Sequence, residues 1–335
     1  MIAQSLLETV AARAADTEAQ RRLPADLAAE LAEAGLFRML VPTSLGGAET
    51  DVASLFDSLE QLGRADAATG WCVMIGGTTA LISAWLPLEH AREIWADPNV
   101  ITGGVFAPMG RAAVDGDDYV VSGRWAWGSG SANCSWLLGG AVIMDGAEMR
   151  RLPSGAPDHR MMVMRRHEVE LIDTWDALGM RGTGSGDLAA TNVRVPQGRS
   201  VSFITDTPRE TGPLYRFAPF GLLALGIAAV ASGNALGALD DLKALAVAKK
   251  GQGSSRSLAE RGVVQADFAV ATADLDAARA LVHAEIASAW DRVVAGDTLD
   301  LPARARLRLA ATRLTQVSAR VAAKMHELAG GTSVY

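Results

Sequence analysis

The chain has 335 residues, of which 49% are hydrophobic and 21% charged, a balance that is ordinary for a globular protein long enough for two or three cores. Its 31 basic and 38 acidic residues give a net charge of −7 without a basic run, which argues against nucleic acid and anionic membranes as partners. Two cysteines, Cys72 and Cys134, are too few for a disulfide framework or a metal centre. We therefore expect buried thiols, no metal site and a cytoplasmic protein.

Helical periodicity dominates the first hundred residues. Pro24 is typical of a helix start, and Asp51 is a candidate N-cap for a second helix. The apolar residues after Asp51 recur at spacings of three and four, at positions 52, 55, 56, 59 and 62. The sequence thus predicts an all-helical N-terminal domain over residues 1–98.

Two uncharged stretches, 67–88 and 217–239, are long enough to cross a bilayer. Both contain several glycines and hydroxyl residues, and neither has a basic flank on one side. Helices that are apolar all round also occur at the centre of large helical bundles. We interpret both stretches as buried core helices and expect no membrane contact.

The pattern changes near Val100, where glycine, valine and aromatic residues take over. The DGDD turn signal at 115–118 precedes Tyr119-Val120-Val121, and Pro196 closes a series of short apolar runs. A middle β-sandwich or barrel domain is predicted over residues 99–200.

Long alanine-rich helical patterns then return at 221–245, 258–290 and 303–328. They predict a C-terminal helical bundle domain over residues 214–335. The chain ends on GGTSVY, where a glycine pair that breaks a helix is followed by further apolar residues. We expect this bundle to be truncated, with its last helix missing.

The segment most informative about chemistry is YVVSGRWAWGSGSANCSW at 119–136, which holds Trp125, Trp127 and Trp136. Small residues at 128–132 would let a flat ring approach the backbone, and a hydroxyl there could bond a ring nitrogen. An isoalloxazine fits this description. The alternative is that the tryptophans pack a β core. The five histidines are widely spaced, and the GTGSG run at 182–186 is not a dinucleotide-binding fingerprint.

Within the α–β–α order, the run from Tyr119 to Gly130 resembles the Y-x-x-x-G-x-K-x-W-I-T-N strand of the acyl-CoA dehydrogenase superfamily. The resemblance implies an α+β fold of that type, with Trp127 beside a flavin ring and Ser129 as the catalytic hydroxyl near flavin N5. The ELAGG run is similar to a family turn that reaches the flavin pyrophosphate of a neighbouring subunit in tetramers. By this resemblance, a homotetramer (a dimer of dimers) is expected, with a turn at the flavin made by Glu327, Gly330 and Gly331.

Three runs resemble one branch of that superfamily more closely, the oxygenase components of two-component flavin-dependent monooxygenases. They are FAPMG at 106–110, RGTGS at 181–185 and ATGW at 68–71. The resemblance implies FAD or FMN supplied reduced by a separate flavin reductase, and hydroxylation of a small aromatic substrate with O2. It implies a cofactor contact at Phe106 and a substrate pocket at Trp71, Thr78 and Arg181.

The chain also departs from this branch. Gly104 stands where the branch tends to carry a second serine, and no histidine occurs near Thr78. The sequence ends at Tyr335, before the glutamate base of the dehydrogenases or the histidine of the hydroxylases would follow. Two alternatives therefore stay open, an FAD-dependent acyl-CoA dehydrogenase that desaturates an acyl thioester and a non-catalytic or repurposed member of the family.

Overall fold

The computed structural model describes residues 2–250 and 255–334, so Tyr335 lies outside the described residues. Its internal contacts divide the chain into two compact units. The helical unit comprises Met1–Ala11, Asp51–Gly70 and Arg216–Tyr335, and the sheet unit comprises Ala12–Thr50 and Trp71–Tyr215. Secondary structure follows the predicted order of helices, strands and helices.

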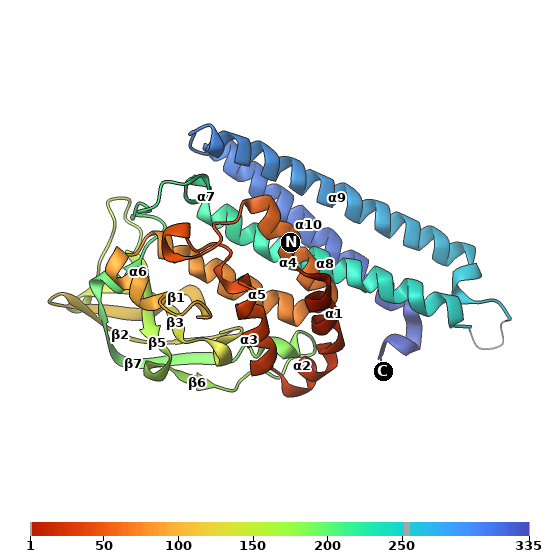
Figure 1. The fold of residues 1–335 in the computed structure, drawn as a ribbon, viewed down its shortest axis with the longest axis horizontal. Coiled ribbons are helices and arrows are strands. Elements are labelled where there is room, and N and C mark those ends of the chain that lie inside the picture. Colours follow the sequence, from red (N-terminus) through yellow and green to blue (C-terminus); the bar gives the residue numbers. More distant parts are fainter. Residues whose placement is uncertain (1, 251–254, 335) are drawn as a thin grey trace. The chain divides into compact units, whose positions relative to one another are not determined.

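In the helical unit, α8 (Pro219–Ala248) packs against α4 (Val52–Ala65) and α10 (Leu301–Ala329), which also contacts α9 (Gly262–Val294) (Figure 1). The unit also contains α1 (Gln4–Ala12), up to Ala11. Asp51 caps α4 as predicted, since its carboxylate accepts the Ser54 N–H at 2.9 Å. Asp300 caps α10 in the same way.

Two helical stretches in the described residues are long and apolar enough to cross a membrane by length and composition alone. They are Ala67–Ala84, which starts with α5 (Ala67–Thr79), and α8. Burial reaches 78% in the apolar window of the first stretch and 56% in that of α8. Such burial favours the predicted interpretation of both stretches as core helices.

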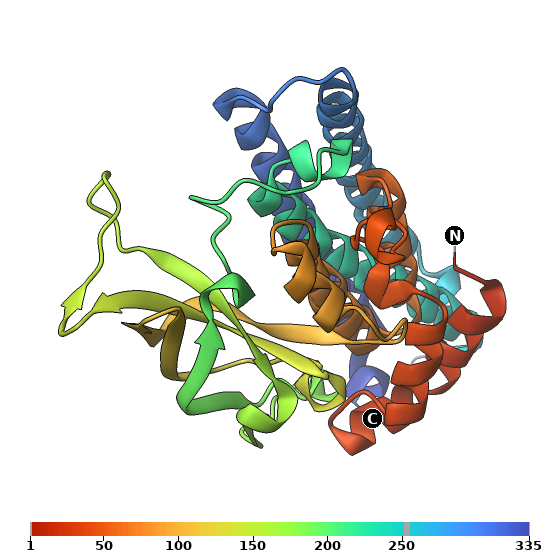
Figure 2. The same ribbon diagram turned by 60° about the vertical axis from the view of Figure 1, so that its left-hand side comes forward.

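The sheet unit is built on one eight-stranded mixed sheet, where a sandwich or barrel was predicted. The strand order is β6-β7-β2-β1-β3-β5-β8, with β4 paired to β3. Figure 2 shows strands of this sheet in yellow and green. All pairings are antiparallel except that of β1 with β3. The strands are β1 (Thr102–Asp115), β2 (Asp118–Trp125), β3 (Trp136–Asp145), β4 (Glu148–Met149), β5 (His159–Arg165), β6 (Glu170–Ile172), β7 (Asp187–Pro196) and β8 (Ser200–Val201).

Helices of the sheet unit are α2 (Ala14–Gln20), α3 (Ala25–Glu33), α6 (Leu88–Ile94), α7 (Pro213–Arg216) up to Tyr215 and the part of α5 that follows Gly70. A core cluster joins residues of α6, such as Ile94, to residues of the sheet, such as Leu138 and Val163. Phe106 and Phe203 pack against the edge of this cluster. The sheet is thereby covered by apolar side chains from the helical segments of the same unit.

Trp125 is fully buried at the centre of the sheet, and its indole N–H donates to the Gly140 carbonyl at 2.7 Å. Three glycines on three strands leave room for the indole. A Cβ at Gly110, Gly123 or Gly139 would come within 2.4 to 2.8 Å of the Trp125 ring. These glycines are therefore required by packing against one large side chain.

Gly139→Ala is expected to lower the free energy of unfolding by about 1–3 kcal/mol, the usual cost of overpacking a core. The added methyl would meet Trp125 Cζ2 at 2.5 Å, and the indole is held by its hydrogen bond. Urea unfolding followed by tryptophan fluorescence measures the change. Gly179→Ala is the matched control, because nothing lies within 4 Å of its Cβ position. Equal unfolding midpoints for the two variants would show that the packing of Trp125 does not require glycine at position 139.

Candidate functional site

A pocket of about 360 Å³ in the sheet unit has the residue types expected of a site for a flat ligand. Its volume falls within the roughly 300–1,000 Å³ common for small-molecule sites. Three tryptophans and one methionine form most of its wall, and three hydroxyl residues complete it. The lining residues are Trp71, Trp127, Ser129, Trp175, Met180, Thr183 and Ser185.

Trp71 of α5 and two loops form this wall, and the loops are the turn after β2 and the loop before β7. Backbone hydrogen bonds join them, from Gly128 N to Gly186 O at 2.7 Å and from Gly130 N to Thr183 O at 2.9 Å. Both loops contain residues in the left-handed region of backbone space, which allows the tight turns. The hydroxyls at 129, 183 and 185 are therefore held in fixed positions.

Trp127 has an unusual backbone and an unusual exposure. Its φ is +69°, a conformation that costs a non-glycine residue about 1–3 kcal/mol and that tends to occur at functional sites. Its side chain is 67% exposed, although indole is a large apolar group. A strained backbone thus presents a flat ring to the pocket.

Buried hydroxyls of the same pocket wall form a continuous series of hydrogen bonds. Trp71 Nε1 donates to Ser129 Oγ at 3.0 Å, and Ser129 Oγ lies 2.6 Å from Ser185 Oγ. Ser185 Oγ in turn lies 2.6 Å from Thr183 Oγ1, which donates to the Met180 carbonyl at 2.9 Å. The three hydroxyl residues are each at most 5% exposed.

The three clustered tryptophans of the sequence separate in the structure. Trp125 is a core residue, and Trp136 lies in a cluster with the guanidinium groups of Arg165 and Arg199 at 4.7 and 5.5 Å from its ring centroid. For these two, the core-packing alternative holds. Trp127 alone among the three lines the pocket, which fits the expectation of a planar partner.

Other predicted site residues of the sheet unit lie outside the lining. Phe106 stacks with Phe203 at a centroid distance of 5.9 Å and meets the His159 ring edge-on. Thr78 donates its hydroxyl to the Met74 carbonyl at 2.7 Å, within its own helix. Arg181 pairs with Asp176 at 3.0 Å, although it lies in the same loop as Thr183.

Glu327, Gly330 and Gly331 belong to the helical unit. The Glu327 carboxylate binds Lys324 Nζ at 2.7 Å. Gly330 has a φ of +59° and ends α10, and Lys249 hydrogen-bonds the Ala329 carbonyl just before it. The structure thus brings Trp71, Trp127 and Ser129 together within one unit and places the predicted Gly-Gly turn in the other.

Four of the lining residues were not predicted from the sequence as site residues. They are Trp175, Met180, Thr183 and Ser185. The available signal was the RGTGS run, which supplied Arg181 as a candidate but not the two hydroxyls beside it. Ser129 and Ser185 are 56 residues apart in the sequence, and their contact depends on how the loop before β7 folds.

The pocket fits an isoalloxazine ring. The exposed Trp127 indole offers a flat apolar surface, and Ser129 Oγ offers a polar atom at the wall. None of the seven lining residues has an ionisable side chain, so this wall can bind, orient and exclude water but cannot act as an acid or a base. Among the residues that the structure describes, no group of three or more His, Cys, Asp or Glu side chains could hold a metal ion.

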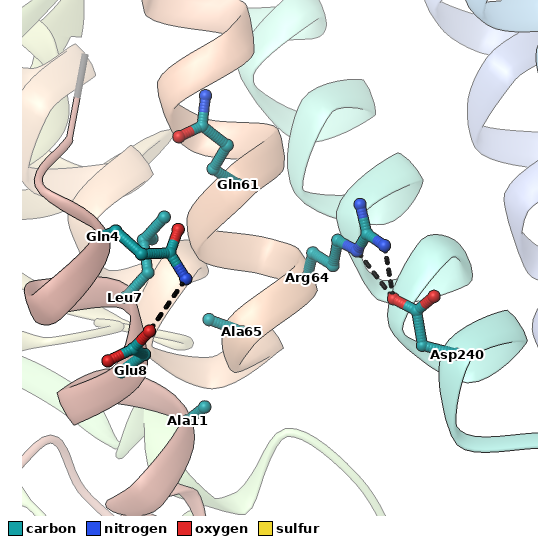
Figure 3. A pocket seen from close by; sticks show the side chains of 8 residues that line it. All are labelled: Gln4, Leu7, Glu8, Ala11, Gln61, Arg64, Ala65 and Asp240. Carbon is teal, nitrogen blue, oxygen red and sulfur yellow. Dashed lines mark hydrogen bonds and ion pairs between the residues drawn. The ribbon is translucent and has the colours of Figure 1, made fainter. Parts of the chain in front are cut away.

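Two other pockets, in the helical unit, are lined by charged groups that pair with each other. In one of about 480 Å³, Arg64 binds Asp240 at 2.7 Å and Gln4 donates to Glu8 at 3.2 Å (Figure 3). In the other, of about 420 Å³, Glu60 binds Arg279. These intramolecular pairs occupy the groups that would otherwise recognise a ligand.

Family models for the acyl-CoA dehydrogenase N-terminal and C-terminal domains match residues 1–91 and 225–335. The indole-3-acetate monooxygenase of Pseudomonas putida is 31% identical to this chain, over 97% of the chain and 81% of that protein. This chain belongs to the acyl-CoA dehydrogenase family. The predicted fold class and family are thereby confirmed.

Two further relatives are hydroxylases, and one of them is FADH2-dependent. The oxygenase component of the FADH2-dependent resorcinol hydroxylase from Rhizobium sp. (strain MTP-10005) is 29% identical, over 82% of this chain and 69% of that protein. The crystal structure of 3-HSA hydroxylase from Rhodococcus sp. RHA1 superimposes with a TM-score of 0.88 at 28% identity, over 99% of this chain and 86% of that one. The resemblance to the monooxygenase branch of the acyl-CoA dehydrogenase family is confirmed.

Proposed function

We propose that this chain is the oxygenase component of a two-component flavin-dependent monooxygenase that hydroxylates a small aromatic substrate with O2. The observation that carries the proposal is the pocket in which the exposed Trp127 ring and the Ser129 hydroxyl share a wall without any ionisable side chain. The indole-3-acetate monooxygenase and the FADH2-dependent resorcinol hydroxylase among its relatives support it. Reduced flavin would come from a separate reductase, because an oxygenase component by itself has no source of electrons.

FAD is the proposed flavin, on the strength of the FADH2-dependent relative. When bound, the flavin supplies the two electrons that convert one atom of O2 to water while the other atom enters the substrate. The chain's own residues hold and shield it. Trp127 would stack on the ring, Ser129 would hydrogen-bond its polar edge, and Trp71, Trp175 and Met180 would exclude water.

We further propose that the protein works in the cytoplasm as a homo-oligomer, a dimer of dimers. The two cysteines, Cys72 and Cys134, are buried thiols outside any disulfide bond, which supports a reducing compartment. Burial raises the pKa of the Cys134 thiol to about 12, so this thiol stays protonated and unreactive at neutral pH.

Reduced FAD is expected to raise the melting temperature of the protein. Trp127→Ala is expected to weaken FAD binding about 5- to 150-fold, the loss of one stacking contact of roughly 1–3 kcal/mol. Anaerobic fluorescence titration measures the affinity. Leu178→Ala is the control, because Leu178 is a fully exposed apolar residue of the neighbouring loop that does not line the pocket.

Activity is tested with a flavin reductase, NADH, O2 and a panel of phenols and indoles. The expected result is a hydroxylated product that requires both proteins. Failure of reduced and oxidised flavin alike to bind would refute the proposed function. Reduction of bound FAD by an acyl-CoA without the reductase would instead establish the dehydrogenase alternative.

A further inference from the structure

The chain of hydroxyls behind Ser129 has a direction that follows from proton counting. Each serine or threonine hydroxyl has one proton to donate. A carbonyl oxygen can only accept, so the bond of 2.9 Å between Thr183 Oγ1 and the Met180 carbonyl uses the Thr183 proton. The 2.6 Å contact between Thr183 and Ser185 must then be donated by Ser185.

The direction of the hydrogen bond between Ser129 and Ser185 follows in the same way. Because the Ser185 proton points to Thr183, the 2.6 Å contact between Ser185 and Ser129 is donated by Ser129. Ser129 Oγ also accepts the Trp71 Nε1–H at 3.0 Å, and an indole nitrogen can only donate. Ser129 is left with one lone pair and no proton to offer a ligand in the pocket.

The opposite direction of these hydrogen bonds is unfavourable. The Met180 carbonyl also accepts hydrogen bonds from Trp175 Nε1 at 2.9 Å and from the Thr183 N–H at 3.1 Å. It would therefore keep two hydrogen bonds if Thr183 Oγ1 donated elsewhere. However, Thr183 Oγ1 and the Met180 oxygen would then be two acceptors 2.9 Å apart with no proton between them. Thr183 is 1% exposed, so water cannot enter to relieve this repulsion.

We propose that this directional chain of hydrogen bonds, from Ser129 through Ser185 to Thr183, makes Ser129 a hydrogen-bond acceptor toward the ligand. Ser129 thereby selects reduced flavin over oxidised flavin. The proposal rests on the proposed function. Flavin N5 carries a hydrogen in the reduced ring and only a lone pair in the oxidised ring, so it changes from donor to acceptor on oxidation. An acceptor at Ser129 bonds the first state and repels the second. Ser185 and Thr183 are positioning residues, since they act through Ser129.

Selection of this kind would suit a site that takes up reduced flavin and releases it oxidised. One hydrogen bond gained in one redox state and lost in the other corresponds to roughly a ten-fold difference in affinity. A ten-fold ratio of dissociation constants also raises the two-electron reduction potential of bound flavin by about 30 mV. Both quantities can be measured without turnover.

The test compares dissociation constants of oxidised FAD and of anaerobically reduced FAD for the full chain. Wild type is expected to bind reduced FAD at least about ten-fold more tightly. Ser185→Ala frees the Ser129 proton to reach oxidised N5, so the ratio should fall about ten-fold through tighter binding of oxidised FAD, with a fall in potential of about 30 mV. Ser129→Ala should lower the same ratio by weakening binding of reduced FAD.

Thr183→Val should lower the ratio as Ser185→Ala does, because valine keeps the shape and removes the hydroxyl that fixes the direction. Thr183→Ser keeps that hydroxyl and should retain the wild-type ratio. Ser83→Ala is the matched control, because Ser83 is a fully buried serine of the same unit whose hydroxyl donates to the Ala80 carbonyl in its own helical turn.

The outcomes separate the two proposals. If neither redox state of FAD binds wild type, the proposed function is wrong and the inference falls with it. A different outcome is that FAD binds with a ratio of oxidised to reduced dissociation constants near one in wild type, or with a ratio unchanged in both Ser185→Ala and Thr183→Val. Either result would refute the inferred direction of the hydrogen bonds and leave the proposed function standing.

Discussion

Gly104→Ser is expected to lower the free energy of unfolding by about 2–6 kcal/mol, the sum of two penalties of about 1–3 kcal/mol each. The first penalty is the backbone, because Gly104 has a φ of +152°, which L-residues rarely adopt. The second is steric. A Cβ there would lie 2.1 Å from the Leu138 carbonyl oxygen and 2.6 Å from the Leu138 nitrogen.

The clash at Gly104 cannot be relieved by a side-chain rotation, since both atoms of Leu138 belong to the backbone of β3. Gly104 and Leu138 are paired in the parallel ladder of β1 and β3, so a shift would break the centre of the sheet. Urea unfolding measures the effect, with Gly179→Ser as the control in open space. An unfolding midpoint equal to that of wild type would show that the ladder of β1 and β3 accommodates a side chain at position 104, and would contradict the prediction.

The close packing around Gly104 also accounts for a departure noted in the sequence. The monooxygenase branch tends to carry a second serine where this chain has Gly104, and that loss put the resemblance in question. The structure leaves no room for any side chain at Gly104. The hydroxyls next to Ser129 come instead from Thr183 and Ser185. A missing serine in β1 therefore does not mean a missing hydroxyl at the site.

Helices were the part of the fold that the sequence predicted best, because their signals are local. Asp51 is a cap by its residue type and position, and the apolar spacing after it specifies the buried face of α4. Pairing between strands is not local. The parallel ladder of β1 with β3 depends on the long path between them, so strand signals predicted a β domain without its sheet order.

The site was predicted only in part, because its contacts are also not local in the sequence. An indole suits a core and a ligand wall equally well, so three clustered tryptophans could not be separated by composition. The left-handed backbone at Trp127 decides which one is exposed, and no sequence rule predicts that conformation for a tryptophan. The partners of Ser129 were missed because their contacts join two loops that are far apart in the sequence.

Glu60→Ala is expected to lower the free energy of unfolding by about 3 kcal/mol, the lower end of the range for breaking a buried ion pair. The Glu60 side chain is 9% exposed and accepts two hydrogen bonds from Arg279, at 2.8 and 2.6 Å, and a third at 2.5 Å from Ser232. Removing the carboxylate leaves Arg279, 28% exposed, without its main partner. Urea unfolding at pH 7 measures the loss.

Asp240→Ala is the matched control, since it breaks the pair of Asp240 with Arg64 in the same unit at a similar distance of 2.7 Å. Both of those side chains are about half exposed, so the expected change is about 0–1 kcal/mol. Equal losses from the two variants would mean that burial does not set the strength of the pair.

The contribution of Glu60 should also depend on pH. Burial opposes ionisation and would raise the pKa of Glu60, but the hydrogen bonds from Arg279 and Ser232 outweigh it and hold the pKa below its usual value. A carboxyl whose pKa is lower in the folded state stabilises the protein fully above its unfolded pKa, about 4.3. That stability is lost as the pH falls through the folded pKa. The difference between wild type and Glu60→Ala should therefore be constant from pH 7 to about pH 5 and shrink below pH 4. A difference that grows on acidification would show that burial, and not Arg279, controls the ionisation of Glu60.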